Sequence, residues 1–387
     1  MGNFDIVIVG GGMVGQAFAL SMAKRHQSNL SIAIIDPNNP NPEVKENFHT
    51  RVSAITPTSE TFLKDIGVWD LIQRKYAFTD TKVWDENSHG ALDFSIADED
   101  LTHLGHIIEN DCIQSAMYTA LADTTVEFIS AKLDDINKTQ QGYCLHLDDK
   151  QQLQCSLLIG ADGARSRVRD LAGIEFSEND YQQKAVVCNI RSNKGFENTT
   201  WQRFLSESII ALLPLSKNEA SIVWSAEKHL SDELLALSPE AFAKRLSAGV
   251  EVRFGEFEIL SEIQAFPLIE RSAKDYVKEN LALIGDAAHN IHPLAGQGVN
   301  LGFSDVVELS RQLHTNNKLF GGYLVLRKYA RARRLDNELM AKTMSGLNWI
   351  YKENNEPLRW LRGFGMNLIN DNSTFKSFFQ KHASGSQ

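Results

Sequence analysis

The sequence contains little cysteine, and its cysteines form no recognisable pair. Cys112, Cys144, Cys155 and Cys188 are scattered through 387 residues without a CxxC motif. This spacing disfavours a zinc ribbon, a redox dithiol and a disulfide framework. We therefore expect reduced thiols and a cytoplasmic protein.

Long hydrophobic runs are also lacking. No run approaches the roughly 18 to 20 apolar residues of a membrane-spanning helix. The first five residues lead directly into an expected strand, so we expect no signal peptide. A formal net charge of -10 disfavours general affinity for nucleic acid or anionic lipid, although a local basic surface remains compatible with it. We expect a soluble or peripheral protein with no nucleic-acid partner.

The N-terminal residues 5–36 have the pattern strand, glycine turn, helix, strand. Gly10, Gly12 and Gly15 match GxGxxG, and Asp36 ends the second strand about 20 residues further on. In this setting the glycines allow a tight turn, close approach of a pyrophosphate and close helix packing, and the acid suits a ribose 2′-hydroxyl. The pattern predicts an adenine-dinucleotide site, with FAD and NAD both open and NADP disfavoured.

A second glycine-rich stretch covers residues 284–305. The preceding LALIG predicts a short buried strand, so Asp286 falls at its carboxyl end, where open α/β sheets bind ligands. Pro293, Gly296 and Gly298 form a turn before an expected helix. Bare backbone at a helix start suits a flat, electron-rich ligand. We favour a ligand site over an ordinary strand-to-helix connection.

Four histidines are candidates for a functional role. His289 and His292 lie in the second glycine-rich stretch, and histidine titrates near neutrality, so both are candidate catalytic residues; bracing of the loop is the favoured alternative. His103 and His106 are interpreted as polar residues at a sheet edge, because no third ligand follows at a recognisable spacing. We expect no metal site.

Two further positions combine charge with a loop. Asp162 and Gly163 end an apolar strand, and three arginines follow at positions 165, 167 and 169, a combination suited to phosphate; a basic helix start on the surface is the alternative. Arg51 stands on a loop before an expected helix over 58–66, where contact with a dinucleotide and a surface salt bridge are both open. The chain has a single GxGxxG, which disfavours a second dinucleotide domain.

The remaining stretches differ from the glycine-rich motifs in their pattern of apolar, aromatic and basic residues. Alternating runs over 176–266 predict antiparallel strands of a substrate domain, and residues 76–104 also have a strand-like pattern. Candidates for lining an apolar cavity there, with plain core as the alternative, are Trp201, Phe204, Leu212, Leu213, Trp224 and Phe266. A basic helix over 323–337 and an aromatic, basic tail suit either an interfacial or partner-facing element or helices packed on the main domain.

Three separated stretches together resemble the single-component flavoprotein aromatic hydroxylases, which have the p-hydroxybenzoate hydroxylase fold. They are GGGMVG, IGADGARSRVR and IGDAAHNIHPLAGQGVNLG, and the resemblance spans nearly the whole chain. Within that class, RVSAITPTSETFLKDIGVWD, HLGHIIEND, ALLPLSKNEASIVWS and LRGFGMNLIND resemble the ubiquinone-biosynthesis hydroxylases. VWDENSHG with HLGHIIEN is most similar to the 2-polyprenylphenol hydroxylase branch.

The resemblance implies a mixed α/β fold with a Rossmann-like FAD-binding domain, an inserted antiparallel-sheet substrate domain and a C-terminal helical region. The implied FAD-binding parts are 1–75, 105–175 and 271–345, the substrate-domain parts are 76–104 and 176–270, and the helical region is 346–387. The residues implied to bind FAD are Gly10, Gly12, Gly15 and Asp36 at the ADP half, Arg51 along the cofactor, Asp162 and Gly163 near the pyrophosphate and the pyridine nucleotide, Gly285 and Asp286 at the ribityl chain, and Pro293, Gly296, Gly298, Val299 and Asn300 at the isoalloxazine.

The implied activity is FAD-dependent hydroxylation of a polyprenylated phenol in ubiquinone biosynthesis, through a flavin hydroperoxide, with molecular oxygen and with NAD(P)H or another electron donor. The implied step is that on 2-polyprenylphenol. Alternatives are another ring-hydroxylation step of the same pathway, a flavin reductase on an isoprenoid substrate and a non-catalytic flavin-binding scaffold. The C-terminal region could contact other ubiquinone-biosynthesis proteins or the membrane surface, with the protein peripheral at the inner membrane face.

Overall fold

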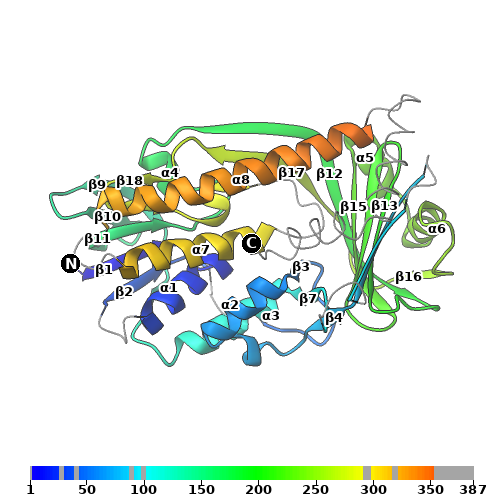
Figure 1. Cartoon of the computed structure of the whole chain (residues 1–387), viewed down its shortest axis with the longest axis horizontal. Coiled ribbons are helices and arrows are strands. Elements are labelled where there is room, and N and C mark those ends of the chain that lie inside the picture. Colours follow the sequence, from blue (N-terminus) through cyan, green and yellow to red (C-terminus); the bar gives the residue numbers. More distant parts are fainter. Residues whose placement is uncertain are drawn as a thin grey trace.

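The computed structural model describes residues 2–25, 30–38, 43–86, 91–96, 102–290, 298–315 and 321–352, with side chains described for all of these except 91, 315 and 339–352. His292, Pro293, Gly296 and the tail beyond Lys352 lie outside the described residues. Two large sheets lie at opposite ends of the molecule, with a long helix, α8 (Tyr323–Lys352), running along one side (Figure 1).

The N-terminal unit is the predicted βαβ motif, formed by β1 (Gly2–Val9), α1 (Met13–Arg25) and β2 (Ile32–Ile35). All four residues of β2 and the last four of β1 are buried, as expected for parallel strands covered on both faces. The sheet has the order β18-β19-β11-β1-β2-β8, and β9 and β10 extend it from β11. Its other strands are β8 (Glu127–Ile129), β9 (Leu133–Lys138), β10 (Tyr143–Leu147), β11 (Gln152–Gly160), β18 (Val277–Lys278) and β19 (Leu281–Leu283).

The register of this sheet determines where the loops meet. β1, β11 and β19 are parallel neighbours, with Val9 opposite Gly160 and Gly160 opposite Leu283. Each strand therefore ends at the same edge of the sheet. The glycine turn, the Asp162 loop and the Asp286 loop, which are far apart in sequence, begin side by side at that edge.

Helices cover the sheet and form one core with it. α1 packs against α3 (Asn110–Leu121) and α7 (Gly298–Thr315), and α7 packs against α8 and α2 (Pro57–Asp65). Thr56 caps α2 by accepting a hydrogen bond from the Ser59 N–H, with Pro57 in the first turn. Shorter helices are η1 (Trp69–Leu71) and α4 (Arg167–Leu171). The expected helix over 58–66 is thus present as α2, and α8 extends past the basic helix expected over 323–337 into the expected C-terminal region.

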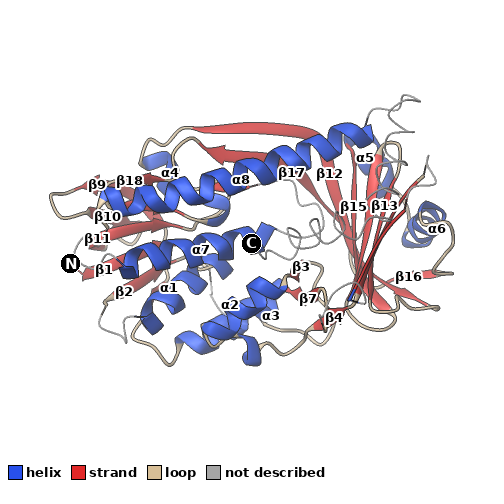
Figure 2. Cartoon of the chain, in the orientation of Figure 1, coloured by secondary structure: helices blue, strands red, loops and turns tan. Residues whose placement is uncertain are grey.

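The second sheet lies at the other end of the molecule (Figure 2). Its order is β20-β17-β12-β15-β14-β13-β5-β6, with β16 paired to β12. The neighbours along this path are antiparallel except β13 and β5. The strands are β5 (Asp80–Asp85), β6 (Ala91–Ser95), β12 (Phe176–Ser192), β13 (Thr199–Phe204), β14 (Ser208–Pro214), β15 (Glu219–Glu227), β16 (Phe257–Ile259), β17 (Gln264–Ala273) and β20 (His289–Asn290).

The two sheets are connected more closely than the predicted boundaries imply. β20 pairs with Arg271 and Ser272 of β17, so the stretch after Asp286 adds to the second sheet although it lies within the expected third FAD-binding part. A small sheet of β3 (Val52–Ile55), β7 (Gly105–Glu109) and β4 (Tyr76–Phe78) lies between them. The domain limits themselves stay a prediction.

Alternation along the second sheet separates its two faces. Val186, Leu212 and Trp224 belong to a core under α5 (Lys228–Leu235) and α6 (Pro239–Gly249), with Trp224 packed on Phe242. The adjacent residues point the other way because side chains alternate along a strand. Those that line a cavity are Ala185, Val187, Leu213, Val223, Phe266 and Leu268. Of the predicted cavity residues, Leu213 and Phe266 line this cavity, whereas Trp201, Leu212 and Trp224 are core and Phe204 packs with Ile209.

Candidate active site

The three glycines of the first motif have three different surroundings. Gly10 has a φ of +111°, and a Cβ there would lie 2.2 Å from the Ala161 carbonyl oxygen. A Cβ on Gly15 would lie 2.0 Å from the Gly10 carbonyl oxygen, so this position lets α1 pack on the turn. Gly12 has no atom within 4 Å of its Cβ position. The turn is closed at Gly10 and Gly15 and open at Gly12, where a ligand can reach the backbone.

The open side of Gly12 faces two cavities. One, of about 560 Å³, lies beside Asp36, whose Oδ2 accepts a hydrogen bond from the Gly11 N–H at 2.7 Å. The other, of about 540 Å³, lies between the two large sheets. Gly12, Ala161 and Gly163 line both, so the two cavities form one groove across the sheet edge. Arg165 and Arg167 add positive charge to the first cavity.

Asp162 organises the second loop. Its carboxylate accepts hydrogen bonds from the Ser166 Oγ at 2.5 Å and from the backbone N–H of Arg167 and Val168 at 2.7 and 3.0 Å. It thereby holds the start of α4. Burial raises the pKa of Asp162, and the hydrogen bonds oppose this without cancelling it. Asp162 shapes the groove wall, and the neighbouring Gly163 presents bare backbone to both cavities.

Asp286 and Arg51 face the cavity between the sheets. The Asp286 carboxylate opens on the cavity and accepts a hydrogen bond from Asn290 Nδ2 at 3.1 Å. The side chain is exposed to the cavity, but the surrounding protein displaces part of its hydration and raises its pKa, while His289 and Arg51 lower it. The Arg51 guanidinium lies 5.6 Å from the centre of the Phe266 ring, on the second sheet. Arg51 therefore joins the cofactor side of the cavity to its apolar wall.

His289 is bonded to a buried carboxylate, which disfavours a role as a catalytic base. Its Nε2 lies 2.6 Å from Oδ2 of Asp305, a fully buried carboxylate on α7, and its ring stacks on Tyr276. Arg333 of α8 donates from Nε to the other oxygen of Asp305 at 2.8 Å. This geometry agrees with the favoured bracing role of His289, although the ring also lines the cavity.

The N-terminus of α7 borders the same cavity. Gly298 and Val299 line it, and no atom of the described residues lies within 4 Å of a Cβ placed on Gly298. The Asn300 side chain instead bonds to the backbone of neighbouring elements. Its Nδ2 donates to the Ala54 carbonyl at 2.8 Å, and its Oδ1 accepts from the Thr56 N–H at 3.2 Å. Asn300 thus joins α7 to β3 and α2, whereas Gly298 and Val299 remain open to a ligand.

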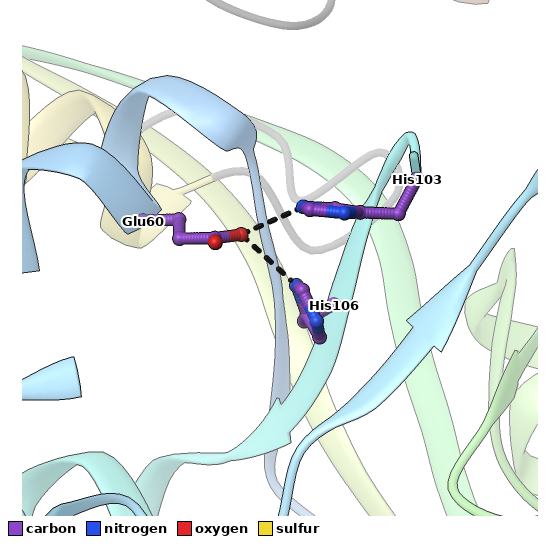
Figure 3. A group of neighbouring side chains, drawn as sticks. All are labelled: Glu60, His103 and His106. Carbon is purple, nitrogen blue, oxygen red and sulfur yellow. Dashed lines mark hydrogen bonds and ion pairs between the residues drawn. The ribbon is translucent and has the colours of Figure 1, made fainter. Parts of the chain in front are cut away.

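The other predicted histidines meet an acid that spacing did not reveal. His103 Nε2 lies 2.7 Å, and His106 Nδ1 3.2 Å, from Oε2 of Glu60 on α2 (Figure 3). The three could chelate a cation, but the Lys64 ammonium lies 2.7 Å from the other Glu60 oxygen, and Lys75 adds positive charge near His106. Burial, reinforced by His103, lowers the pKa of His106 to about 4. The surroundings favour a buried ion-pair cluster, and the absence of a metal site stays a prediction.

Sequence reasoning missed three contributors to this site. Asp305 stands among apolar residues of the expected helix. An acid on the apolar side of a helix is a signal of a buried carboxylate, and this signal could have identified it. Gln114 of α3 lines the cavity and donates to the Gly11 carbonyl at 3.3 Å. Arg333 lies in a run of basic residues, and no nearby residue indicates that it is buried. Its acidic partner, Asp305, is 28 residues away in the sequence.

The groove fits FAD. Bare backbone at Gly12, Gly163 and Gly298 leaves the room that a side chain would fill, and it occurs in both cavities. Asp36 and two arginines line one cavity and the N-terminus of α7 lines the other, which suits a ribose and a pyrophosphate in the first and an electron-rich ring in the second. The residues present can hold the cofactor from Asp36 to Gly298.

Comparison with known proteins supports this fit. Residues 3–342 match the family model described as FAD binding domain. The chain is 34% identical to 3-demethoxyubiquinol 3-hydroxylase of Escherichia coli (strain K12), with 98% of both chains covered. It is 33% identical to the mouse mitochondrial ubiquinone biosynthesis monooxygenase COQ6 (98% and 91% covered) and 31% identical to the ubiquinone hydroxylase UbiL of Rhodospirillum rubrum (98% and 89% covered). The fold matches p-nitrophenol 4-monooxygenase of Pseudomonas putida DLL-E4 with a TM-score of 0.80 at 18% identity, covering 100% and 99% of the two chains.

The fold, the groove and the family match define a FAD-dependent monooxygenase with the p-hydroxybenzoate hydroxylase fold. The chain belongs to the family of FAD-dependent ubiquinone-biosynthesis hydroxylases. FAD is its cofactor, and NAD(P)H is the typical reductant of this family. The predicted family, fold class and cofactor are confirmed.

Proposed function

We propose that this enzyme hydroxylates the aromatic ring of a polyprenylated phenol. The observation that carries the proposal is the cavity of about 540 Å³, which has the cofactor residues on one side and an apolar strand face on the other. The apolar face, with Ala185, Val187 and Val223, suits an isoprenoid phenol better than a charged acid. The names of the related hydroxylases support the same substrate class.

The protein side of the reaction consists of placement and exclusion of water. Bound FAD, reduced by a pyridine nucleotide, supplies the activation of molecular oxygen. Asp286 and the N-terminus of α7 hold the cofactor, and the strand face of the second sheet holds the phenol ring against it. Apolar side chains around the ring keep water from the reacting atoms.

The proposed step is the one on 2-polyprenylphenol, on the basis of the VWDENSHG and HLGHIIEN stretches. A second candidate is hydroxylation of 3-demethoxyubiquinol, favoured by the 34% identity to an enzyme of that name. Short-chain analogues of both compounds distinguish the two. Purified enzyme is incubated with NADH or NADPH and each analogue, and products are identified by mass spectrometry with ¹⁸O₂.

The first proposal requires faster nicotinamide oxidation and one ¹⁸O atom in the product from the 2-prenylphenol. Product from the demethoxyubiquinol analogue alone would move the enzyme to the second candidate. Unchanged oxidation with no labelled product from either compound would contradict the substrate class. Yellow colour and FAD release on denaturation, measured on the same sample, confirm that the enzyme carries its cofactor.

We propose a peripheral position at a membrane, through the outer face of α8. Leu324 and Leu335 are exposed there beside Arg327, Lys328 and Arg331, a pattern suited to an anionic lipid surface. No described helix is both long enough and apolar enough to cross a membrane. Flotation with vesicles that contain anionic lipid tests this. Equal flotation of the wild type and an Arg327→Glu, Arg331→Glu variant would contradict it.

A further inference from the structure

A buried carboxylate joins three elements behind the cofactor cavity. Asp305 stands two turns into α7 and is fully buried. Its Oδ2 accepts hydrogen bonds from the Gly285 N–H at 2.9 Å and from His289 Nε2 at 2.6 Å, and its Oδ1 accepts from Arg333 Nε at 2.8 Å. The acid therefore touches the Asp286 loop, its own helix and α8.

This arrangement tolerates little displacement. Removing a carboxylate from water costs several kcal/mol unless hydrogen bonds and an opposite charge replace the water. Burial would raise the pKa of Asp305, but His289 and Arg333 outweigh it and hold the pKa below its ordinary value of 3.8. Arg333 is itself fixed by Asp336 at 2.9 Å and Asn337 at 3.0 Å. Moving any one of the three donors removes a hydrogen bond from a fully buried carboxylate.

The groups that bond to Asp305 from the Asp286 loop lie at the wall of the cofactor cavity. Gly285 directly precedes Asp286, and the His289 ring lines the cavity. On the far side, the Tyr329 hydroxyl of α8 donates to the Leu283 carbonyl at 2.8 Å. The loop that carries Asp286 is thus clamped from α7 and α8 together.

We propose that Asp305 is a positioning residue for FAD. It keeps Asp286, on the ribityl side, at a fixed separation from Gly298 at the start of α7, on the ring side. An ionised carboxylate can only accept, so His289 donates to Asp305 from Nε2 and its ring is held in one orientation. The separation of the two FAD contacts, Asp286 and the N-terminus of α7, is therefore fixed before the cofactor binds.

The test is Asp305→Asn, which keeps the size and removes the charge. FAD is titrated into apoprotein of the full chain, with circular dichroism to confirm the fold and the visible spectrum to report the flavin environment. We expect at least about a tenfold rise in Kd, which corresponds to about 1.4 kcal/mol, and a shifted flavin spectrum. A role in general stability alone would lower Tm and leave both Kd and the spectrum of the folded protein unchanged.

A double-mutant cycle shows whether Asp305 acts through Asp286. If it does, adding Asp305→Asn to Asp286→Ala produces little further rise in Kd, because the contact it positions is already missing. Additive effects would overturn the proposal. Glu308→Gln is the matched control: this acid lies one turn further along α7 and accepts hydrogen bonds from Arg311 and Gln312 of its own helix, so the Kd of the variant should equal that of the wild type.

A second pair of variants covers the case in which Asp305→Asn does not fold. His289→Gln retains a side-chain N–H donor for Asp305, whereas His289→Leu removes it. Because the ring also lines the cavity, both variants change the wall, and the proposal requires the loss of FAD affinity to be smaller in the first than in the second. Equal affinity in both would contradict it.

Discussion

Gly12 and Gly15 lie three positions apart, yet a methyl group should have opposite effects at the two. The Cβ position of Gly12 is open, so Gly12→Ala should change the unfolding free energy of the apoprotein by no more than about 0.5 kcal/mol. It should weaken FAD binding, because the methyl enters the groove. Gly15→Ala places a Cβ 2.0 Å from the Gly10 oxygen and should destabilise the fold by roughly 1 to 3 kcal/mol. Urea unfolding and FAD titration of both variants check this, and equal stability losses would contradict it.

Asp286 should stabilise the holoenzyme while destabilising the apoprotein. Its folded pKa is raised above the ordinary value of 3.8 by burial, so the charged form is disfavoured in the fold and stability is lost as pH rises through the folded pKa. Asp286→Asn should therefore make the apoprotein more stable than the wild type at pH 7, with the difference vanishing below about pH 3.8. The same variant should bind FAD more weakly. Thermal unfolding with and without FAD measures both, and a less stable apoprotein at pH 7 would contradict the sign.

At the scale of elements, alternation along β15 separates substrate contact from stability. Val223 lines the cavity, whereas the adjacent Ile222 is fully buried in the core under α6. Val223→Phe should raise the KM for a prenylated phenol with little change in Tm or FAD affinity. Ile222→Phe should destabilise the fold by roughly 1 to 3 kcal/mol through overpacking. Steady-state kinetics and thermal unfolding distinguish the two, and a matching loss of Tm in both variants would contradict the assignment of the faces.

The junction of α2 and β7 should be sensitive to acid. Burial lowers the folded pKa of His106 to about 4, below its ordinary value of 6.5, so the unfolded chain binds the proton first and stability falls between pH 6.5 and 4. The groups that face it are His103, Glu60, Lys75 and Lys64. His106→Phe keeps a ring against Trp69 and should flatten this fall.

Urea unfolding at pH 7 and pH 4.5 measures the effect. His229→Gln is the control, because that histidine is exposed and lies on α5, outside the cluster around His106. A His106→Phe variant that loses stability as steeply as the wild type would argue that the cluster does not bury the imidazole in solution.

At the scale of the whole molecule, FAD should stabilise both large sheets. The cavity between them is lined by Gly12 and Asp286 at the edge of the first sheet and by Val187 and Leu268 of the second. FAD at about 100 times its Kd should add about 2.7 kcal/mol to the unfolding free energy. Amide exchange should slow in β12 and β17 as well as in the glycine turn. Slowing confined to the glycine turn would contradict a cofactor site shared by the two sheets.

Much of the cofactor half was predictable because its signals are local. The GxGxxG turn, its flanking strand and helix, and Asp36 are specified within residues 5–36, and β2 and β19 were recognisable as short buried apolar runs. Period-two alternation predicted the strands of the second sheet but not which face would be open. Leu212 and Leu213 look alike in sequence, and only the placement of α6 on one side made the first a core residue and the second a cavity residue.

The amino-acid sequence by itself determined the dinucleotide-binding turn and the order of the elements, because turn glycines, strand-end acids and apolar periodicity act over a few residues. The family and the choice of FAD over NAD followed from the resemblance of its motif stretches to known flavoprotein hydroxylases. Tertiary structure decided what depends on distant pairs. Arg333 reaches Asp305, Glu60 meets His103, and the groove closes between two sheets whose strands come from all parts of the chain. Each of these charges is buried beside a partner that is distant in sequence, and no local pattern specifies such a partner. The contacts of Asp305 with His289 and Arg333 could therefore be recognised only in the tertiary structure.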